Sequence, residues 1–300
     1  MEEERTQGKL RQAVSAAGGI NARVKVALVG VPVLLLILFL TPPWAFGIAV
    51  GLISGVSAVE LVSATRTGGN IRVMGYVAVS AFAIPFLMSL PQVILGWLFV
   101  VFLLTIALFV ETLLAYDTER AMPISFFGLN FFAGAVIPLF LGSLSILRSI
   151  AEIGPFFDGR VYVLIPIIIA FVTDAGAYFA GHAFGKHKLL EKVSPKKTIE
   201  GSIGGFVAAL VSMLVFSLVL IFAFDAEYSW PAIFLYSILG SAVTQIGDLA
   251  FSLIKREYAK KDFGNLLPGH GGVLDRFDSM IFVAPFITVM VFWLPIVVRS

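Results

Sequence analysis

Residues 247–278 read GDLAFSLIKREYAKKDFGNLLPGHGGVLDRFD and concentrate polar groups in a chain that is otherwise mostly apolar. Asp248, Ser252 and Lys255 are spaced i, i+4 and i+7, so on a helix they lie on one face. Further along, a proline and three glycines predict that this helix has ended and that a tight turn follows. The stretch therefore predicts a polar helix face and a turn between two apolar runs.

Two aspartates, Asp275 and Asp278, close the stretch at spacing i and i+3, with Arg276 between them. We expect them near the start of the last apolar helix, because carboxylates stabilise a helix N-terminus and its free N–H groups also bind phosphate. Carboxylates beside basic side chains predict a site for a hard cation and for phosphate groups.

The composition places this chemistry in a membrane. The chain is 59% hydrophobic and 13% charged, with a mean hydropathy of +0.97, whereas soluble domains are about a quarter charged. The absence of cysteine from the sequence excludes disulfides, thiolate nucleophiles and Cys-bound zinc, and the three histidines are scattered. We expect any metal to take oxygen ligands, which indicates Mg²⁺.

The apolar runs predict an all-α, polytopic integral membrane protein with about nine transmembrane helices. They cover about residues 24–41, 43–63, 73–90, 92–115, 126–147, 160–182, 202–224, 230–254 and 277–298. Eighteen of the 21 Lys and Arg residues then fall on the side of the N-terminus. The positive-inside rule therefore predicts a cytoplasmic N-terminus and an external C-terminus.

Charge divides the chain into three parts. Residues 1–22 are expected to form a cytoplasmic or interfacial arm, and residues 23–150 a scaffold of transmembrane helices nearly free of ionisable groups. Residues 151–300 hold almost all the polar motifs and are expected to form the catalytic helices, with cytoplasmic loops at 183–200 and 255–276.

Besides Asp248 and Asp278, three carboxylates fall inside predicted spans, where they are costly and therefore candidates for function. For Glu60 and Glu111, near the cytoplasmic ends of their spans, we favour a structural, hydrogen-bonded role. Asp174 lies well inside its span, beside small residues that would let a ligand approach the backbone, so we favour a functional role. His182, about two turns further on, is interpreted as an interfacial histidine.

The loop that follows Asp174's span reads KLLEKVSPKKTIEGSIGG, residues 188–205. Lys196 and Lys197 supply paired cations, and Thr198 and the following glycines supply a hydroxyl and exposed N–H groups. This is phosphate-binding chemistry without a Walker A sequence. The alternative is that the lysines only set topology and touch anionic lipid headgroups.

Several residues of the opening stretch together resemble a family signature that runs from position 252 to 278. They are Ser252, Lys255, Arg256, Lys261, Asp262, Gly264, Leu267, Pro268, His270, Gly271, Gly272, Asp275, Arg276 and Asp278. This set resembles the signature of phosphatidate cytidylyltransferases, also called CDP-diacylglycerol synthases. DAGAY at 174–178 and SPKKTIEG at 194–201 resemble upstream motifs of that family.

The resemblance implies transfer of the cytidylyl group of CTP to phosphatidate, with Mg²⁺ and with CDP-diacylglycerol and pyrophosphate as products. It implies a homodimer among membrane lipids, formed through the N-terminal spans, and no nucleic acid partner. The short length of the chain favours a bacterial plasma membrane. The positive-inside bias puts both basic loops, and with them the active site, on the cytoplasmic side.

On this basis the predicted site residues fall into three groups. We expect Asp248 and Asp275 to be direct metal ligands, with Asp278 completing a second cation site or orienting the first. Lys255, Arg256 and Arg276 are expected to bind the lipid phosphate or the triphosphate. The other predicted substrate-binding residues are Asp174, Lys196, Lys197, Thr198, Ser252 and His270, the first four for CTP; roles within each group are interchangeable.

Two other functions fit parts of the pattern. A CTP-dependent polyprenol or dolichol kinase would transfer the γ-phosphoryl group instead, and the HGGVLDRFD run argues against it. A transporter would also have many spans and intramembrane carboxylates, but it predicts inverted repeats and a polar path at the midplane. The polar residues here crowd one predicted membrane face.

Overall fold

The computed structural model describes residues 30, 32–65, 71–93, 95–116, 123–150, 159–224, 227–267 and 271–298. The predicted arm at 1–22 and the predicted substrate ligand His270 lie outside these residues. The first predicted span, 24–41, lies partly outside them, and residues 32–40 of it are helical.

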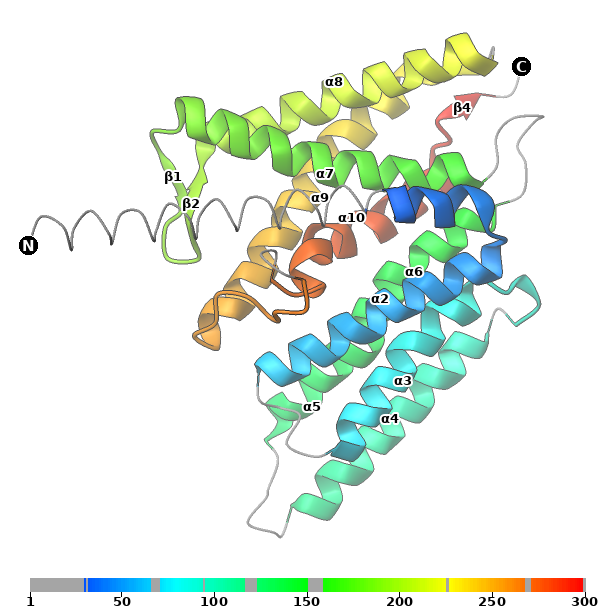
Figure 1. Cartoon of the computed structure of the whole chain (residues 1–300), viewed down its shortest axis with the longest axis vertical. Helices are drawn as coiled ribbons and strands as arrows, with labels where there is room; N and C mark the ends of the chain where they lie inside the picture. Colours follow the sequence, from blue (N-terminus) through cyan, green and yellow to red (C-terminus); the bar gives the residue numbers. More distant parts are fainter. Residues whose placement is uncertain are drawn as a thin grey trace, which may run out of the picture.

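Long helices make up most of the described chain (Figure 1). They are α2 (Pro43–Ala64), α3 (Ile71–Met88), α4 (Gly96–Ala115), α5 (Ile124–Phe131), α6 (Ile137–Arg148), α7 (Gly159–Phe184), α8 (Ile199–Phe224), α9 (Trp230–Glu257) and α10 (Leu274–Trp293). The 3₁₀ turn η1 (Pro91–Val93) precedes α4, and the π-helical turn η2 (Phe132–Val136) joins α5 to α6. Two antiparallel pairs complete the fold: β1 (Lys188–Leu190) with β2 (Ser194–Thr198), and β3 (Glu227–Tyr228) with β4 (Val297–Val298).

Eight helical segments of the described chain are long and apolar enough to cross a bilayer, when α5, η2 and α6 count as one. They coincide with the second to ninth predicted spans. The prediction of an all-α, polytopic membrane protein is thus confirmed, while the first predicted span, the total of nine and the N-in, C-out orientation remain predictions.

The predicted boundaries were wrong at three places near the polar motifs. Helix α9 continues to Glu257, so Lys255 and Arg256 lie in its last turn and not in a loop. Helix α10 begins at Leu274 and ends at Trp293, because Pro295 follows. The loop expected at 183–200 contains the β1–β2 hairpin, which the sequence analysis did not predict.

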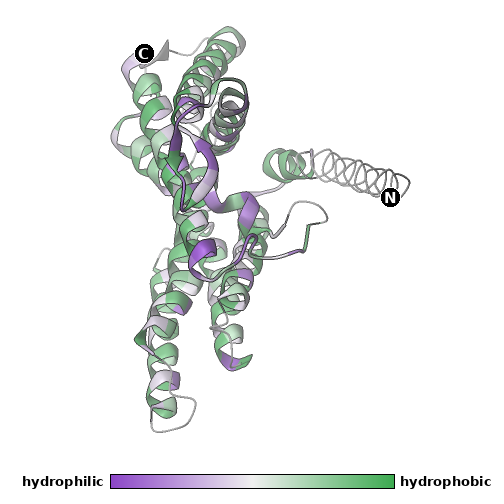
Figure 2. Cartoon of the chain, turned by 90° about the vertical axis from the view of Figure 1, so that its left-hand side faces the viewer, coloured by the Kyte–Doolittle hydropathy of each residue, from purple (hydrophilic) through white to green (hydrophobic). Residues whose placement is uncertain are grey.

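Helices α7, α8 and α9 are longer than a bilayer requires. They have 26, 26 and 28 residues, which gives about 39 to 42 Å against a hydrocarbon core of about 30 Å. The end of α7, the start of α8, the end of α9 and the start of α10 lie together beside the β1–β2 hairpin (Figure 1). Figure 2 shows hydrophilic residues collected at this end of the bundle, so the long helices carry polar groups toward headgroup level.

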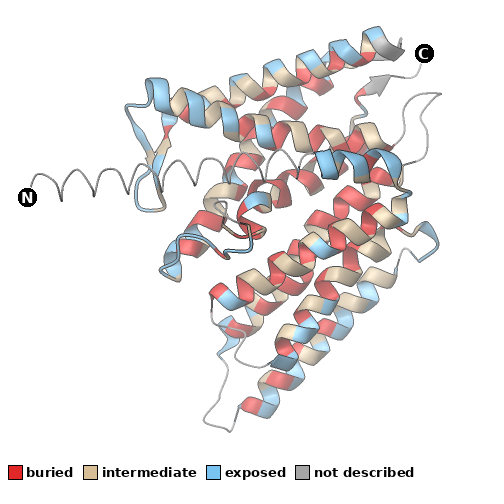
Figure 3. Cartoon of the chain, viewed as in Figure 1, coloured by how far each residue is buried: buried red, intermediate tan, exposed pale blue. Residues whose placement is uncertain are grey.

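The helices form two groups that α10 joins. Helices α2 to α6 pack together, α7 to α9 form the second group, and α10 contacts α2 and α6 on one side and α7 and α9 on the other (Figure 1). Buried residues accordingly concentrate along α10, α2 and α6 (Figure 3), and Ile281, Val283, Ala284 and Ile287 of α10 are fully buried.

The most extensive helix pairing, between α7 and α8, depends on glycine. A Cβ at Gly204 would collide with Ala180, and one at Gly176 would come within 2.9 Å of the Gly204 carbonyl oxygen. Small residues of this kind let membrane helices approach at backbone distance.

Gly204→Leu is expected to separate α7 from α8 and lower the melting temperature in detergent, because overpacking costs about 1–3 kcal/mol. Gly128→Leu is the matched control, since nothing lies within 4 Å of a Cβ at that position. Equal melting temperatures for the two variants would contradict the close packing.

Candidate active site

A polar cavity of about 700 Å³ opens among the gathered helix ends and the β1–β2 hairpin. Nine of the twelve predicted site residues line it: Asp174, Lys196, Lys197, Thr198, Asp248, Lys255, Asp275, Arg276 and Asp278. Stretches separated by about 100 residues along the chain thus meet at one place. The residues that the prediction missed include Gln245 and Asp262, which also line the cavity.

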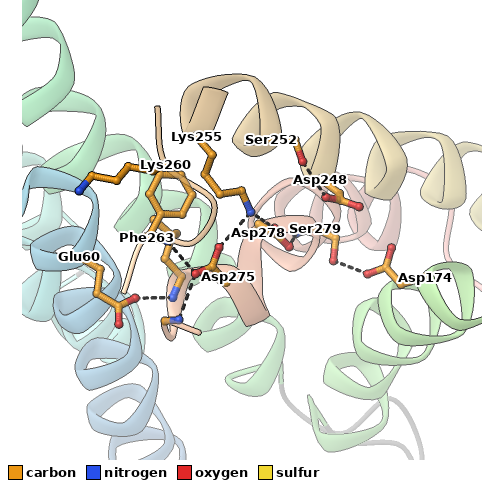
Figure 4. Close-up of polar contacts among 12 residues, drawn as sticks. Glu60, Asp174, Asp248, Ser252, Lys255, Lys260, Phe263, Asp275, Asp278 and Ser279 are labelled. Carbon is orange, nitrogen blue, oxygen red and sulfur yellow. Dashed lines mark hydrogen bonds and ion pairs between the residues drawn. The ribbon is translucent and has the colours of Figure 1, made fainter. Parts of the chain in front are cut away.

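Lys255 is the buried centre of the cavity wall. Its Nζ lies 2.9 Å from Asp275 Oδ1 and 3.6 Å from Asp278 Oδ2, and 5.3 Å from the centre of the Phe263 ring (Figure 4). The side chain is 11% exposed. One ammonium group therefore pairs with both carboxylates at the start of α10.

Asp275 connects helix α9, helix α10 and the loop between them. Its Oδ2 accepts hydrogen bonds from the Phe263 N–H at 2.8 Å and the Gly272 N–H at 3.0 Å, while Oδ1 faces Lys255 (Figure 4). A carboxylate whose side chain is only 2% exposed needs such partners, since an unpaired buried charge is costly. One side chain therefore fixes the position of the loop and of α9 relative to the start of α10.

Glu60, from the distant helix α2, supports the same place. Its Oε1 and Oε2 accept from the N–H groups of Val273 and Leu274 at 3.0 and 2.8 Å (Figure 4). Helix α10 has no side-chain cap from its own N-cap residue, Val273, so Glu60 serves as a cap supplied by another helix. The hydrogen-bonded role expected for Glu60 is confirmed; Glu111, likewise, pairs with Arg72 at 3.1 Å.

Three further carboxylates come from three helices. Asp248 of α9 forms an ion pair with Lys197 of β2 and lies 3.4 Å from the Ser252 hydroxyl. Asp278 Oδ1 accepts the Ser279 N–H, and the Ser279 hydroxyl donates to Asp174 Oδ2 of α7 at 2.9 Å (Figure 4). Ser279 thus links α7 to α10, a role the sequence analysis missed although the residue directly follows Asp278.

The hairpin that carries Lys196 and Lys197 is anchored at its base. Glu200 accepts from the N–H groups of Lys186 and His187, and its Oε1 lies 2.6 Å from His187 Nδ1. The Thr198 hydroxyl accepts the Gly201 N–H at 3.1 Å and so caps α8.

Two predicted residues lie beside the cavity instead of lining it. Arg256 points toward the hairpin, where Nε donates to the Val193 carbonyl oxygen at 3.2 Å. It follows Lys255 by one position, a rotation of about 100° around the helix. Ser252 reaches the site through Asp248.

The carboxylates suit Mg²⁺ by chemistry, without forming a ready-made cage. Among the described residues, no three Asp, Glu or His side chains meet closely enough to hold a metal ion. Mg²⁺ usually takes one or two protein carboxylates and completes its shell with water and substrate phosphate. Asp174, Asp248 and Asp278 all line the cavity, and one or two of these carboxylates would meet that requirement.

Comparison with known proteins points to one family. Residues 21–294 match the family model described as the cytidylyltransferase family. A Bacillus subtilis protein named phosphatidate cytidylyltransferase is 47% identical over 131 residues, 43% of this chain and 46% of the relative. A Staphylococcus haemolyticus protein of the same name is 40% identical over 159 residues, 50% of this chain and 60% of the relative. The match spans about half the length of these curated relatives.

Glu60→Ala is expected to leave two N–H groups of α10 without acceptors, which costs about 1–3 kcal/mol. Hydrogen exchange at Val273 and Leu274 should therefore accelerate. Glu111→Ala removes another carboxylate of the N-terminal helices, which pairs with Arg72 of α3, and should leave exchange at these two amides unchanged. Unchanged exchange in Glu60→Ala would refute the cap.

Lys255→Met is expected to destabilise the protein by about 3–5 kcal/mol, because it leaves Asp275 and Asp278 buried without their cation. Adding Asp278→Asn should recover part of this loss. The measurement is thermal unfolding in detergent, with the exposed Lys261→Met as control. If the double variant were less stable than Lys255→Met, the shared pairing would be wrong.

Proposed function

The chain belongs to the cytidylyltransferase family, and from this premise we propose that it transfers the cytidylyl group of CTP to phosphatidate, giving CDP-diacylglycerol and pyrophosphate. The observation that carries the proposal is a cavity lined by carboxylates and bases at the polar ends of membrane helices. The relatives' name, phosphatidate cytidylyltransferase, supports the choice of substrates.

The charge of the cavity wall bears on the cofactor. Five aspartates line it (Asp174, Asp248, Asp262, Asp275 and Asp278), and so do five basic residues (Lys188, Lys196, Lys197, Lys255 and Arg276). A wall with balanced charge does not by itself neutralise two polyanionic substrates. We therefore propose that CTP is bound together with Mg²⁺, held by Asp248 and Asp278 with Asp174 beside them, and a second cation is compatible with this set.

The proposed reaction requires little general acid–base catalysis by the protein. An anionic phosphate oxygen of phosphatidate attacks the α-phosphorus of CTP, and the bond from that phosphorus to the bridging oxygen of the β-phosphate breaks. The electron pair leaves with pyrophosphate, so no proton has to be removed from the nucleophile. Bound Mg²⁺ would neutralise phosphate charge, and the chain must align the two phosphates and stabilise the leaving group.

The contacts assign roles within this reaction. Lys196 and Lys197, on an anchored hairpin, would bind the triphosphate, and Lys197 would exchange Asp248 for a phosphate when CTP enters. Arg276 and Lys255 would bind the lipid phosphate. Asp275 was expected to be a metal ligand; since both its oxygens already accept hydrogen bonds, we now propose that it positions Lys255 and the loop.

The setting of the reaction is proposed as well. We expect the cavity to face the cytoplasm, where CTP is available, in the plasma membrane, and the chain to form a homodimer through its N-terminal helices. A transporter fits less well, because the residues that line the polar cavity come from one end of the bundle, where hydrophilic residues collect (Figure 2). A CTP-dependent lipid kinase would also bind CTP next to a membrane lipid, but its lipid would attack the γ-phosphorus instead of the α-phosphorus.

Labelled CTP separates these functions. Purified protein with Mg²⁺ and phosphatidate should transfer label from the α position of CTP into lipid and release γ label as pyrophosphate. Transfer of γ label into lipid would mean a kinase, and no transfer to phosphatidate or to polyprenols would favour the transporter.

Replacing Lys196 and Lys197 together by Ala is expected to raise KM for CTP about tenfold or more, because each substitution removes a charge-assisted contact to a phosphate of CTP. Lys192→Ala is the matched control, since that lysine is exposed at the tip of the same hairpin and does not line the cavity. An unchanged KM in the double variant would mean that these two lysines do not bind CTP and only set the membrane topology.

Asp248→Asn is expected to lower kcat and to raise the Mg²⁺ concentration needed for half-maximal rate, because an amide binds Mg²⁺ more weakly than a carboxylate. A Mg²⁺ titration of the rate at saturating CTP measures both. Near wild-type turnover at the same Mg²⁺ concentration would remove Asp248 from the proposed metal site.

A further inference from the structure

A second cavity, of about 240 Å³, lies on the apolar side of the active site. Its wall comes from α2, α6, α7 and α10 and from Gly30, Val33, Leu34 and Ile37, and every side chain in that wall is apolar. Dry apolar cavities of about 150 Å³ already bind small hydrocarbons. A space of this size therefore fits a segment of one hydrocarbon chain and offers no hydrogen bond to a polar ligand.

One face of α7 runs past both cavities. Ile167, Phe171, Asp174, Tyr178 and Gly181 are spaced at i, i+4, i+7, i+11 and i+14, which places them along a single helix face. The first two line the apolar cavity and the last three line the polar cavity. The change from apolar to polar wall thus falls between Phe171 and Asp174, about 4.5 Å along the helix axis.

Helix α10 also borders both cavities, with side chains on different faces of the helix. Asp275, Arg276 and Asp278 line the polar cavity, whereas Phe277 and Met280 line the apolar one. Two helices thus place a polar cavity that contains Arg276 and Lys255 next to a hydrocarbon-binding one. The two cavities together match a molecule with a phosphate head and an apolar tail.

We propose that the apolar cavity binds one acyl chain of the phosphatidate whose phosphate is held in the polar cavity. The inference rests on the proposed function, because it identifies where that substrate's tail lies. Binding of the tail holds the lipid at the depth at which its phosphate meets Arg276. Binding energy from this remote part of the substrate then supports the reaction at the head.

The test compares two phosphatidates that differ in tail length. Dioleoyl phosphatidate reaches the apolar cavity, whereas dihexanoyl phosphatidate has tails too short to fill it. Ala49→Phe on α2 and Leu144→Trp on α6 each place a larger side chain in the cavity wall. Leu103→Trp is the matched control for Leu144→Trp, because Leu103 is 49% exposed on α4, away from both cavities.

We expect both cavity variants to lower kcat/KM for dioleoyl phosphatidate about tenfold while kcat/KM for dihexanoyl phosphatidate stays within about twofold, since only the long tail loses its apolar contacts. Retained turnover of the short lipid also shows that each variant has folded. Leu103→Trp should leave both values unchanged. Equal changes with the two lipids, or no change with either, would overturn the inference.

A direct measurement accompanies the kinetics. A phosphatidate with a photoreactive diazirine in one acyl chain should label α7 or α10 near Phe171, Phe277 or Met280 of the wild-type protein, and this label should fall in Ala49→Phe. Label confined to α4 or to the outer face of α8 would overturn the acyl site. Failure of the wild-type protein to transfer α label from CTP to either lipid would instead refute the proposed function.

Discussion

The fold at the polar end of the bundle depends on the burial of one carboxylate. Asp275 is charged and nearly inaccessible, so it must be surrounded by donors. Lys255 and the N–H groups of Phe263 and Gly272 are those donors, and they come from α9 and from the return loop. Their positions are therefore fixed relative to the start of α10, which is the helix that also carries Arg276 and Asp278 into the cavity.

The N-terminal helices reach this same point through Glu60. Its carboxylate caps α10 from α2, and it occupies the space that a side chain at Gly264 or Gly272 would need. The glycines of the signature thus leave room for an acidic group as well as forming a turn. A part of the chain that the sequence showed only as hydrophobic scaffold thus has a defined contact with a helix that lines the polar cavity.

Local spacing predicted what a single helix or turn determines. The shared face of Asp248, Ser252 and Lys255, and the position of Asp275 at a helix start, follow from helical periodicity and from helix-end electrostatics, and both are confirmed.

The β1–β2 hairpin was not predicted, because its strands are three and five residues long and mostly polar, without an alternating apolar pattern. Pairings between distant helices, such as Ser279 with Asp174 and Glu60 with α10, depend on how the helices pack. The 28 phenylalanines could not locate the apolar cavity, since they are spread over nearly the whole sequence.

The single face of α7 that passes from apolar to polar wall also bears on how the proposed reaction is supplied. A phosphatidate whose tail is bound in the apolar cavity keeps its phosphate at the depth of the lipid headgroups. It does not have to be extracted from the bilayer, so it reaches the site by lateral diffusion in two dimensions. The nucleotide arrives from water in three dimensions. The rate would then follow the mole fraction of phosphatidate in the membrane surface, and the product, which keeps the same tails, would leave sideways along the plane in which its precursor came.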